Sequence, residues 1–205
     1  GVPLVWGGQW EYMQSANRTL TLIIPIVLVA IMLLLYMSTK SWFRTILIMV
    51  TLSFSVVGAI WMLYFLGYNM SVAVWVGIIA LVGLDAETSQ VMLLFIDNSV
   101  ARFRSEGKLR NRRELWFAIH DGAVQRIRPK TMTVVTTFAA LMPLMFASGA
   151  GADTMRRLAA PMIGGLFTSF TLELLIYPAI MYIYYSFQMR RGALEVNEPQ
   201  HLAAA

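Results

Sequence analysis

The sequence predicts an all-α membrane protein: a helical bundle of five transmembrane helices plus an amphipathic helix at the inner membrane surface. Three observations lead to this fold class. Charged residues make up only 13% of the 205 residues, whereas a soluble domain averages about 25%. The mean hydropathy is +0.65, and 58% of the residues are hydrophobic. The apolar residues also fall in long blocks, five of which approach the roughly 20 residues that a helix needs to cross a bilayer.

The predicted elements follow these blocks in order. The five spans are expected at residues 20–37, 46–66, 72–97, 129–147 and 160–187. In the fourth block the apolar run is short, so its helix is expected to start at or before Pro129. Residues 1–18 are interpreted as the end of an extracytoplasmic domain, residues 98–128 as a cytoplasmic loop, and residues 191–205 as a cytoplasmic tail.

The basic residues predict the orientation of the spans. Loops 38–44, 98–130 and 188–205 fall on one side and hold 13 of the 16 Lys and Arg residues. Cytoplasmic loops of membrane proteins are enriched in Lys and Arg. This side is therefore predicted to be cytoplasmic, with the N-terminus outside and the C-terminus inside.

Residues 112–125, within the long inner loop, are expected to form the amphipathic helix. Leu115, Trp116, Ile119 and Ala123 recur there at helical spacing among basic residues. Such a helix is expected to lie along the inner membrane surface; an ordinary solvated loop helix is the alternative.

Composition excludes several function classes. The chain has no cysteine, which excludes disulfides, thiolate metal sites and cysteine nucleophiles. His120 and His201 are too far apart to suggest a histidine metal site. The net charge of +5 comes from residues that flank apolar blocks, which indicates membrane orientation rather than nucleic-acid binding. Ser89 and His120 fall on opposite sides of the inner boundary, which disfavours an intramembrane hydrolase. The chain begins with Gly1 and is interpreted as a fragment.

Two carboxylates interrupt the third span, at Asp85 and Glu87. A charge at the bilayer centre costs about 2.5–3.5 kcal/mol on insertion scales, so such residues usually mark ion or proton pathways. Glu87 falls past the midplane, toward the cytoplasm, where a carboxylate could load and release protons. The alternative is a static ion pair or helix–helix hydrogen bond. Asp85 lies about 200° around the helix from Glu87, so the two are expected to have different roles.

Three further residues are candidates for the site. Lys130 opens the fourth span and is the natural cation for a membrane carboxylate, although it could instead snorkel to the lipid phosphates. Glu173 is another intramembrane carboxylate, with either a functional or a pairing role. Met155 lies at the outer mouth of the fifth span, and thioethers suit soft cations such as Cu(I) or Ag(I). Most of the 14 methionines must nevertheless be packing residues.

Small residues predict movable or closely packed positions. Gly149 and Gly151 belong to an outer turn that is expected to be flexible. Pro161, Gly164 and Gly165 open the fifth span, where they would permit close helix packing or a kink. These five residues are candidates for a structural or gating role.

Four motifs in order resemble the resistance-nodulation-division (RND) exporters. The run Gly-Ala-Val-Gln-Arg-Ile-Arg-Pro-Lys-Thr-Met-Thr at residues 122–133 is similar to the signature of their eleventh helix. Residues 149–155 and 159–165 continue the pattern, and residues 71–73 precede the acidic motif of the third span. The resemblance covers nearly the whole chain.

The resemblance narrows to the heavy-metal efflux (CusA-type) branch. Lys130 follows the Arg-x-Arg-Pro motif where multidrug members carry an apolar residue, and Glu87 matches the glutamate of this branch. The resemblance implies that Glu87 and Lys130 form a proton relay with an aspartate outside this chain, with Asp85 and Glu173 as additional candidates. It also implies that Met155 matches a methionine of the metal path. Asp85, Glu173 and the polar residues 88–90 depart from the pattern of the branch.

The resemblance also implies an assembly. It assigns the chain to helices eight to twelve of a twelve-helix protomer, with a periplasmic strand at residues 1–17. It implies a homotrimer in a Gram-negative inner membrane, surrounded by lipid, that binds a periplasmic adaptor and an outer-membrane channel but no nucleic acid. The expected function is proton-driven export of a heavy-metal cation, with Cu(I) or Ag(I) favoured and no cofactor. The alternatives are an RND exporter of hydrophobic compounds or drugs, and a non-transporting membrane scaffold.

Overall fold

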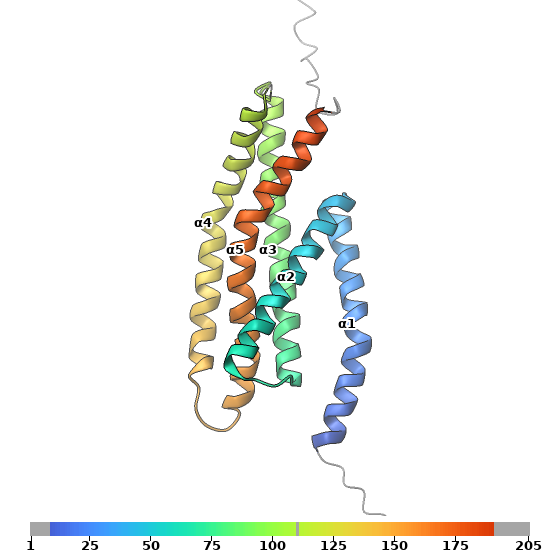
Figure 1. Ribbon diagram of the computed structural model, residues 1–205, viewed down its shortest axis with the longest axis vertical. Coiled ribbons are helices and arrows are strands. Elements are labelled where there is room, and N and C mark those ends of the chain that lie inside the picture. Colours follow the sequence, from blue (N-terminus) through green and yellow to red (C-terminus); the bar gives the residue numbers. More distant parts are fainter. Residues whose placement is uncertain (1–8, 110, 191–205) are drawn as a thin grey trace, which may run out of the picture. The chain divides into compact units, whose positions relative to one another are not determined.

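The computed structural model describes residues 9–109 and 111–190, and these form five α-helices (Figure 1). The helices are α1 (Gln9–Thr39), α2 (Trp42–Leu66), α3 (Val72–Ser105), α4 (Arg112–Met145) and α5 (Ala152–Arg190). No strand occurs among the described residues. The predicted all-α class and the number of long helices are confirmed. The predicted tail, residues 191–205, lies outside the described residues.

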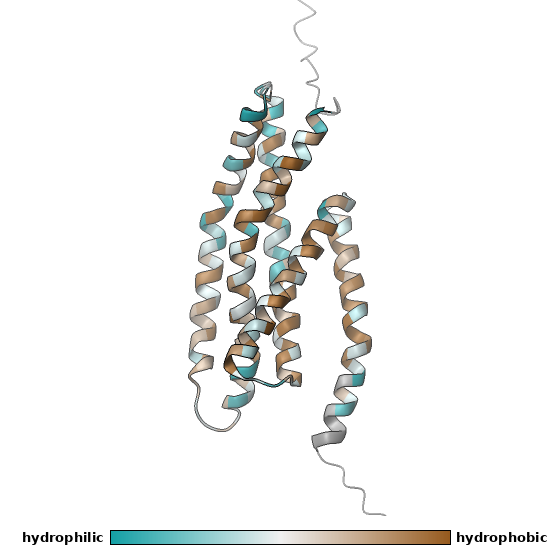
Figure 2. Ribbon diagram, viewed as in Figure 1, coloured by the Kyte–Doolittle hydropathy of each residue, from teal (hydrophilic) through white to brown (hydrophobic). Residues whose placement is uncertain are grey.

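Four helices contain segments that are long and apolar enough to cross a membrane. These segments are Gln14–Thr39, Trp42–Leu66, Val72–Ser105 and Ala152–Arg190. Figure 2 shows long hydrophobic stretches in α1 and α2 and hydrophilic residues where α4 begins. The fourth predicted span, in α4, does not meet the same criterion, because charged residues occupy this helix as far as Lys130.

The predicted cytoplasmic loop at residues 98–128 is mostly helical. Helix α3 continues to Ser105, and α4 begins at Arg112 and runs through Pro129 without a break. The amphipathic segment 112–125 is therefore helical as predicted, but it is the first part of a longer helix. Part of its apolar stripe is buried in the protein, since Leu115 and Ile119 are 0% and 2% exposed, whereas Trp116 is 49% exposed. Leu115 and Ile119 therefore pack against protein, and Trp116 remains accessible.

The N-terminal prediction also needs correction. Residues 1–17 were expected to form a periplasmic strand, but α1 begins at Gln9, so residues 9–17 are helical. Residues 1–8 lie outside the described part of the chain. Residues 9–17 lie directly before a long apolar helical segment. Extending an existing helix adds one backbone hydrogen bond for each residue that joins, which favours helix over strand here.

The chain divides into two compact units, and the long helices α3, α4 and α5 contribute to both. Unit 1 comprises residues 1–86 and 137–169, and unit 2 comprises residues 87–136 and 170–205. In unit 1, small residues allow helices to approach closely. A Cβ atom built on Gly77 of α3 would lie 2.5 Å from the carbonyl oxygen of Leu158 in α5. One built on Gly164 of α5 would lie 2.7 Å from the carbonyl oxygen of Gly58 in α2.

Unit 2 has a core of aliphatic and aromatic side chains from α3, α4 and α5. Met92, Ile96, Leu115, Tyr177 and Met181 are all fully buried. Helix α4 lies against α3 at Gly122, where an added Cβ would be 2.8 Å from the Cα of Ile96. This close approach explains why Leu115, Ile119 and Ala123 are covered by protein.

Replacing Gly122 with alanine is expected to destabilise the protein by about 1–3 kcal/mol, the usual cost of overpacking. The new methyl group would meet backbone atoms of Ile96 and Phe95, which cannot move aside as a flexible side chain could. Denaturant unfolding of the full-length protein in detergent measures the effect. Gly83→Ala is the matched control, because a Cβ there would meet nothing within 4 Å. Equal stability of the two variants would contradict the close α3–α4 approach.

Candidate functional site

An ion pair is buried in unit 2. Lys130 of α4 and Glu173 of α5 form it through Nζ and Oε2. The two residues are 1% and 0% exposed, so water is excluded from both. Lysine and glutamate are almost never fully buried unless they are paired. Removing one partner of such a pair is strongly destabilising, because it leaves an uncompensated buried charge.

The same carboxylate also binds α3. The Ser89 hydroxyl donates a hydrogen bond of 2.6 Å to Oε1 of Glu173, so each carboxylate oxygen has a partner from a different helix. Ser89 is itself fully buried, as is Tyr177, one turn beyond Glu173 on α5. We name Lys130, Glu173 and Ser89 the Lys130 cluster. It joins three helices through one titratable group.

Unit 1 contains a second buried carboxylate, Asp85 of α3. The hydroxyl of Ser169 in α5 donates a hydrogen bond to its Oδ1, and the two residues are each 1% exposed. Within α3, Asp85 is four residues before Ser89, and within α5, Ser169 is four residues before Glu173. Residues four apart lie on the same face of a helix. This matching spacing is the sequence signal by which both serine–carboxylate pairs could have been found.

Glu87 lies in a different environment from these carboxylates. Its side chain is exposed, because two residues along a helix correspond to about 200° of rotation and Asp85 is buried. No ion pair between described residues involves Glu87. The sequence hypothesis paired Lys130 with Glu87, whereas the structure pairs Lys130 with Glu173.

Three other polar contacts in unit 2 were not predicted. Tyr185 of α5 donates a hydrogen bond of 2.6 Å to Asp97 of α3. Asp121 of α4 forms an ion pair with Arg102 and accepts a hydrogen bond of 3.2 Å from Ser99. The Asp121–Arg102 pair is about half exposed, and such pairs contribute little to stability. These contacts are best explained as links between helices.

The predicted metal and turn residues lie in unit 1. Met155 is in the first turn of α5, and its side chain is 48% exposed.

Gly149 and Gly151, in the turn before α5, have φ angles of 113° and 82°, which favour glycine. A Cβ added to Gly165 would meet the side chain of Leu81, and Pro161 lies against Gly77. The described residues contain no group of three or more His, Asp or Glu that could hold a metal ion.

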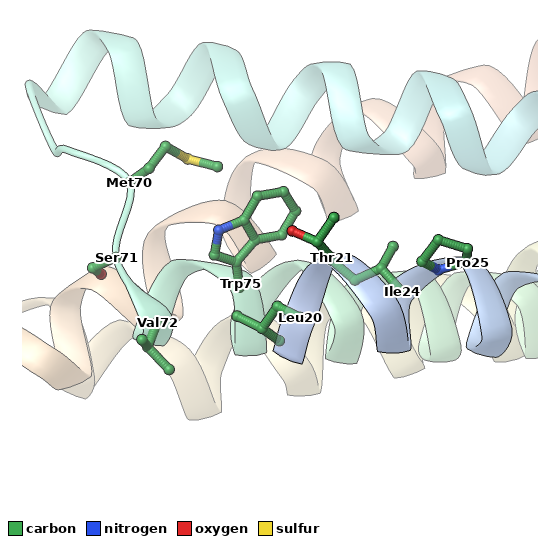
Figure 3. A pocket seen from close by; sticks show the side chains of 8 residues that line it. All are labelled: Leu20, Thr21, Ile24, Pro25, Met70, Ser71, Val72 and Trp75. Carbon is green, nitrogen blue, oxygen red and sulfur yellow. The ribbon is translucent and has the colours of Figure 1, made fainter. Parts of the chain in front are cut away.

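Unit 1 also has an open hollow of about 440 Å³ (Figure 3). Its lining comes from α1, the α2–α3 connection and the start of α3: Leu20, Thr21, Ile24, Pro25, Met70, Ser71, Val72 and Trp75. The lining is mostly apolar, and none of the candidate relay residues contributes to it. The hollow therefore suits an apolar group better than a proton or a metal ion.

The chain is similar to known efflux proteins. The AcrB/AcrD/AcrF family profile matches residues 1–186. The chain is 40% identical over 184 residues to the cation efflux system protein CusA of Escherichia coli O157:H7, covering 87% of this chain and 17% of that protein. It is 40% identical over 188 residues to the putative cation efflux system protein SilA of Salmonella typhimurium, with the same coverage.

A more distant relative and a solved structure are also heavy-metal resistance or efflux proteins. The cobalt-zinc-cadmium resistance protein CzcA of Cupriavidus metallidurans is 33% identical over 180 residues, covering 88% of this chain and 16% of that protein. A crystal structure of a heavy metal efflux pump matches with a TM-score of 0.72 and 29% identity, covering 90% of this chain and 18% of that one. The chain thus spans less than a fifth of the length of these relatives.

Proposed function

The chain belongs to the AcrB/AcrD/AcrF family, and from this premise we propose that it forms part of the membrane domain of a proton-driven pump that exports heavy-metal cations. Its similarity to CusA, SilA and CzcA supports the substrate class. The observation that carries the proton-driven step is the Lys130 cluster, which contains a buried charge pair between α4 and α5. Buried ionisable groups of this kind mark ion and proton pathways in membrane proteins.

In the proposed cycle, a proton that enters from the outer side protonates a relay carboxylate, and Lys130 then changes its partner. Glu87 is the first relay candidate, because its exposed position leaves it able to meet parts of the protein outside this chain. Helix movement would couple proton binding to metal export. Asp85, buried and hydrogen-bonded to Ser169, is the less direct candidate.

The assembly proposed for the whole protein is a homotrimer in a Gram-negative inner membrane. Residues 1–18 would end a periplasmic domain, and residues 191–205 would be a cytoplasmic tail. A periplasmic adaptor and an outer-membrane channel would complete the export path. The basic residues between α3 and α4 support the cytoplasmic assignment of that connection.

Growth of an efflux-deficient host that carries the full-length protein tests this proposal. The host is exposed to copper, silver, zinc and a hydrophobic drug, each over a concentration series. Resistance to copper or silver is the expected result. Resistance to the drug alone would favour the second candidate function, export of hydrophobic compounds, which the apolar hollow of unit 1 supports. Resistance to none of the four would favour a non-transporting scaffold.

Met155→Leu is expected to reduce resistance to copper and silver selectively, because only the thioether binds soft cations. The half-exposed side chain at the start of α5 is free of the packing demands of a core methionine. Growth in copper, silver and zinc measures the effect. Met142→Leu is the matched control, since Met142 is 49% exposed and Met155 is 48% exposed. Equal losses for zinc and copper in Met155→Leu would remove this residue from the proposed metal path.

A further inference from the structure

We propose that Glu173 is a proton-binding residue of the transport cycle, which holds Lys130 in the resting state and releases it when protonated. This inference rests on the proposed proton-driven function. It adds a proton-binding carboxylate in α5 to the relay that the sequence resemblance implies, and it identifies the resting partner of Lys130.

Glu173 contacts two polar residues in unit 2, one from each of two other helices. It is fully buried and binds Lys130 of α4 through one carboxylate oxygen and Ser89 of α3 through the other. Of the ion pairs between described residues, Lys130–Glu173 has both partners buried, whereas the others are partly or largely exposed. Any change in the charge of Glu173 therefore acts directly on α3, α4 and α5.

Protonation would convert this arrangement into an unstable one. A neutral carboxylic acid no longer balances the ammonium group of Lys130, and an unpaired charge is very unfavourable away from water. Lys130 then either loses its own proton or moves toward another carboxylate or toward water, and in the proposed cycle it moves. The α4 helix that carries Lys130 would move or rotate with it. A proton bound at Glu173 is in this way converted into a helix displacement.

The Ser89 hydroxyl suits a group that exists in two protonation states. A hydroxyl can donate one hydrogen bond and can also accept hydrogen bonds. It donates to the carboxylate form of Glu173 in this structure, and after rotation it could accept from the acid form. Ser89 thus keeps Glu173 hydrogen-bonded both before and after proton binding.

Lys130 is the charged group that pairs with Glu173, and neighbouring turns of the same three helices carry other titratable groups. From α5, Tyr177 lies one turn beyond Glu173 and is fully buried. From α4, Arg126 lies one turn before Lys130 and covers the ring of Phe95 at 5.8 Å. From α3, Asp85 is about 6 Å along the helix before Ser89 and accepts a hydrogen bond from Ser169. Asp97 is about 12 Å along the helix after Ser89 and is bound to Tyr185. Glu87, also on α3, is exposed.

The test uses the full-length protein in phosphatidylethanolamine–phosphatidylglycerol vesicles that contain a pH-sensitive dye. Proton flux that depends on added Ag(I) or Cu(I) is measured between pH 5 and pH 8. Glu173→Gln is expected to lower this flux about 100-fold, the lower end for the loss of a proton-transfer group. Glu173→Asp keeps the charge, so it should fold and show a lower flux with a shifted pH profile.

Glu106→Gln is the matched control and should leave both flux and pH profile unchanged. Glu106 lies in the α3–α4 connection and pairs with Lys108 at 2.6 Å, whose ammonium group holds the pKa of this exposed carboxyl below its usual value. Wild-type flux and pH profile in Glu173→Gln, or an unshifted profile in Glu173→Asp, would overturn the inference while leaving the proposed function standing. Absence of metal-dependent flux in the wild type would overturn both.

Discussion

Replacing Lys130 with methionine in the full-length protein is expected to abolish metal resistance and to destabilise the fold by about 3–5 kcal/mol. Lys130 is 1% exposed and pairs with Glu173, which is fully buried. Methionine fills a similar volume but leaves the Glu173 carboxylate without its cation. The loss of stability would come from that uncompensated charge, and the loss of resistance from the missing relay cation.

Denaturant unfolding of the purified protein and growth of the host in copper or silver measure the two effects separately. The double variant Lys130→Met/Glu173→Gln is expected to regain most of the lost stability, because neither buried charge then remains. It should not regain resistance. Recovery of resistance in the double variant would show that the pair has only a structural role.

Arg128→Met provides the matched control for Lys130→Met. Arg128 is a basic residue two positions earlier on α4, and its side chain is exposed. Its replacement is expected to change stability by less than about 0.5 kcal/mol, as for most surface substitutions. Near-normal resistance in Lys130→Met would remove Lys130 from the proposed relay.

The fold was largely predictable because the apolar blocks are long and separated by polar connections. One error concerned residues 9–17, which were predicted as part of a strand and are helical. Another concerned residues 112–125, whose apolar stripe was assigned to the membrane surface but is partly buried in protein. Helical periodicity shows that one face is apolar, but it does not show whether lipid or protein covers that face. Gly122 lies at the close approach to α3, and a small residue in this segment could have indicated packing against another helix.

The sequence singled out the two charged residues of the candidate site but did not predict that they pair with each other. Lys130 and Glu173 were both singled out from the sequence, and the structure brings them together. Their pairing depends on how α4 and α5 are rotated within unit 2, which no local pattern determines. The buried Ser89 gave little signal by itself, because a serine in an apolar helix is ordinarily satisfied by its own backbone. Its importance follows only from the carboxylate that it contacts.

Glu87→Gln in the full-length protein is expected to abolish metal resistance with less than about 0.5 kcal/mol change in stability, as for other surface substitutions. The side chain is exposed and belongs to none of the ion pairs between described residues. The amide removes the proton-binding group and keeps the shape of the side chain. Growth in copper or silver, denaturant unfolding and size-exclusion chromatography of the assembled protein measure the result.

The comparison of Glu87→Gln with Lys130→Met separates two kinds of relay residue. Lys130 has its partner inside unit 2, so its loss should affect both stability and transport. If Glu87 acts through a partner outside this chain, its loss should affect transport alone. Near-normal resistance in Glu87→Gln would remove Glu87 from the relay and leave Glu173 as the carboxylate that acts on Lys130. A loss of stability as large as that of Lys130→Met would instead show that Glu87 is buried and paired in the complete protein.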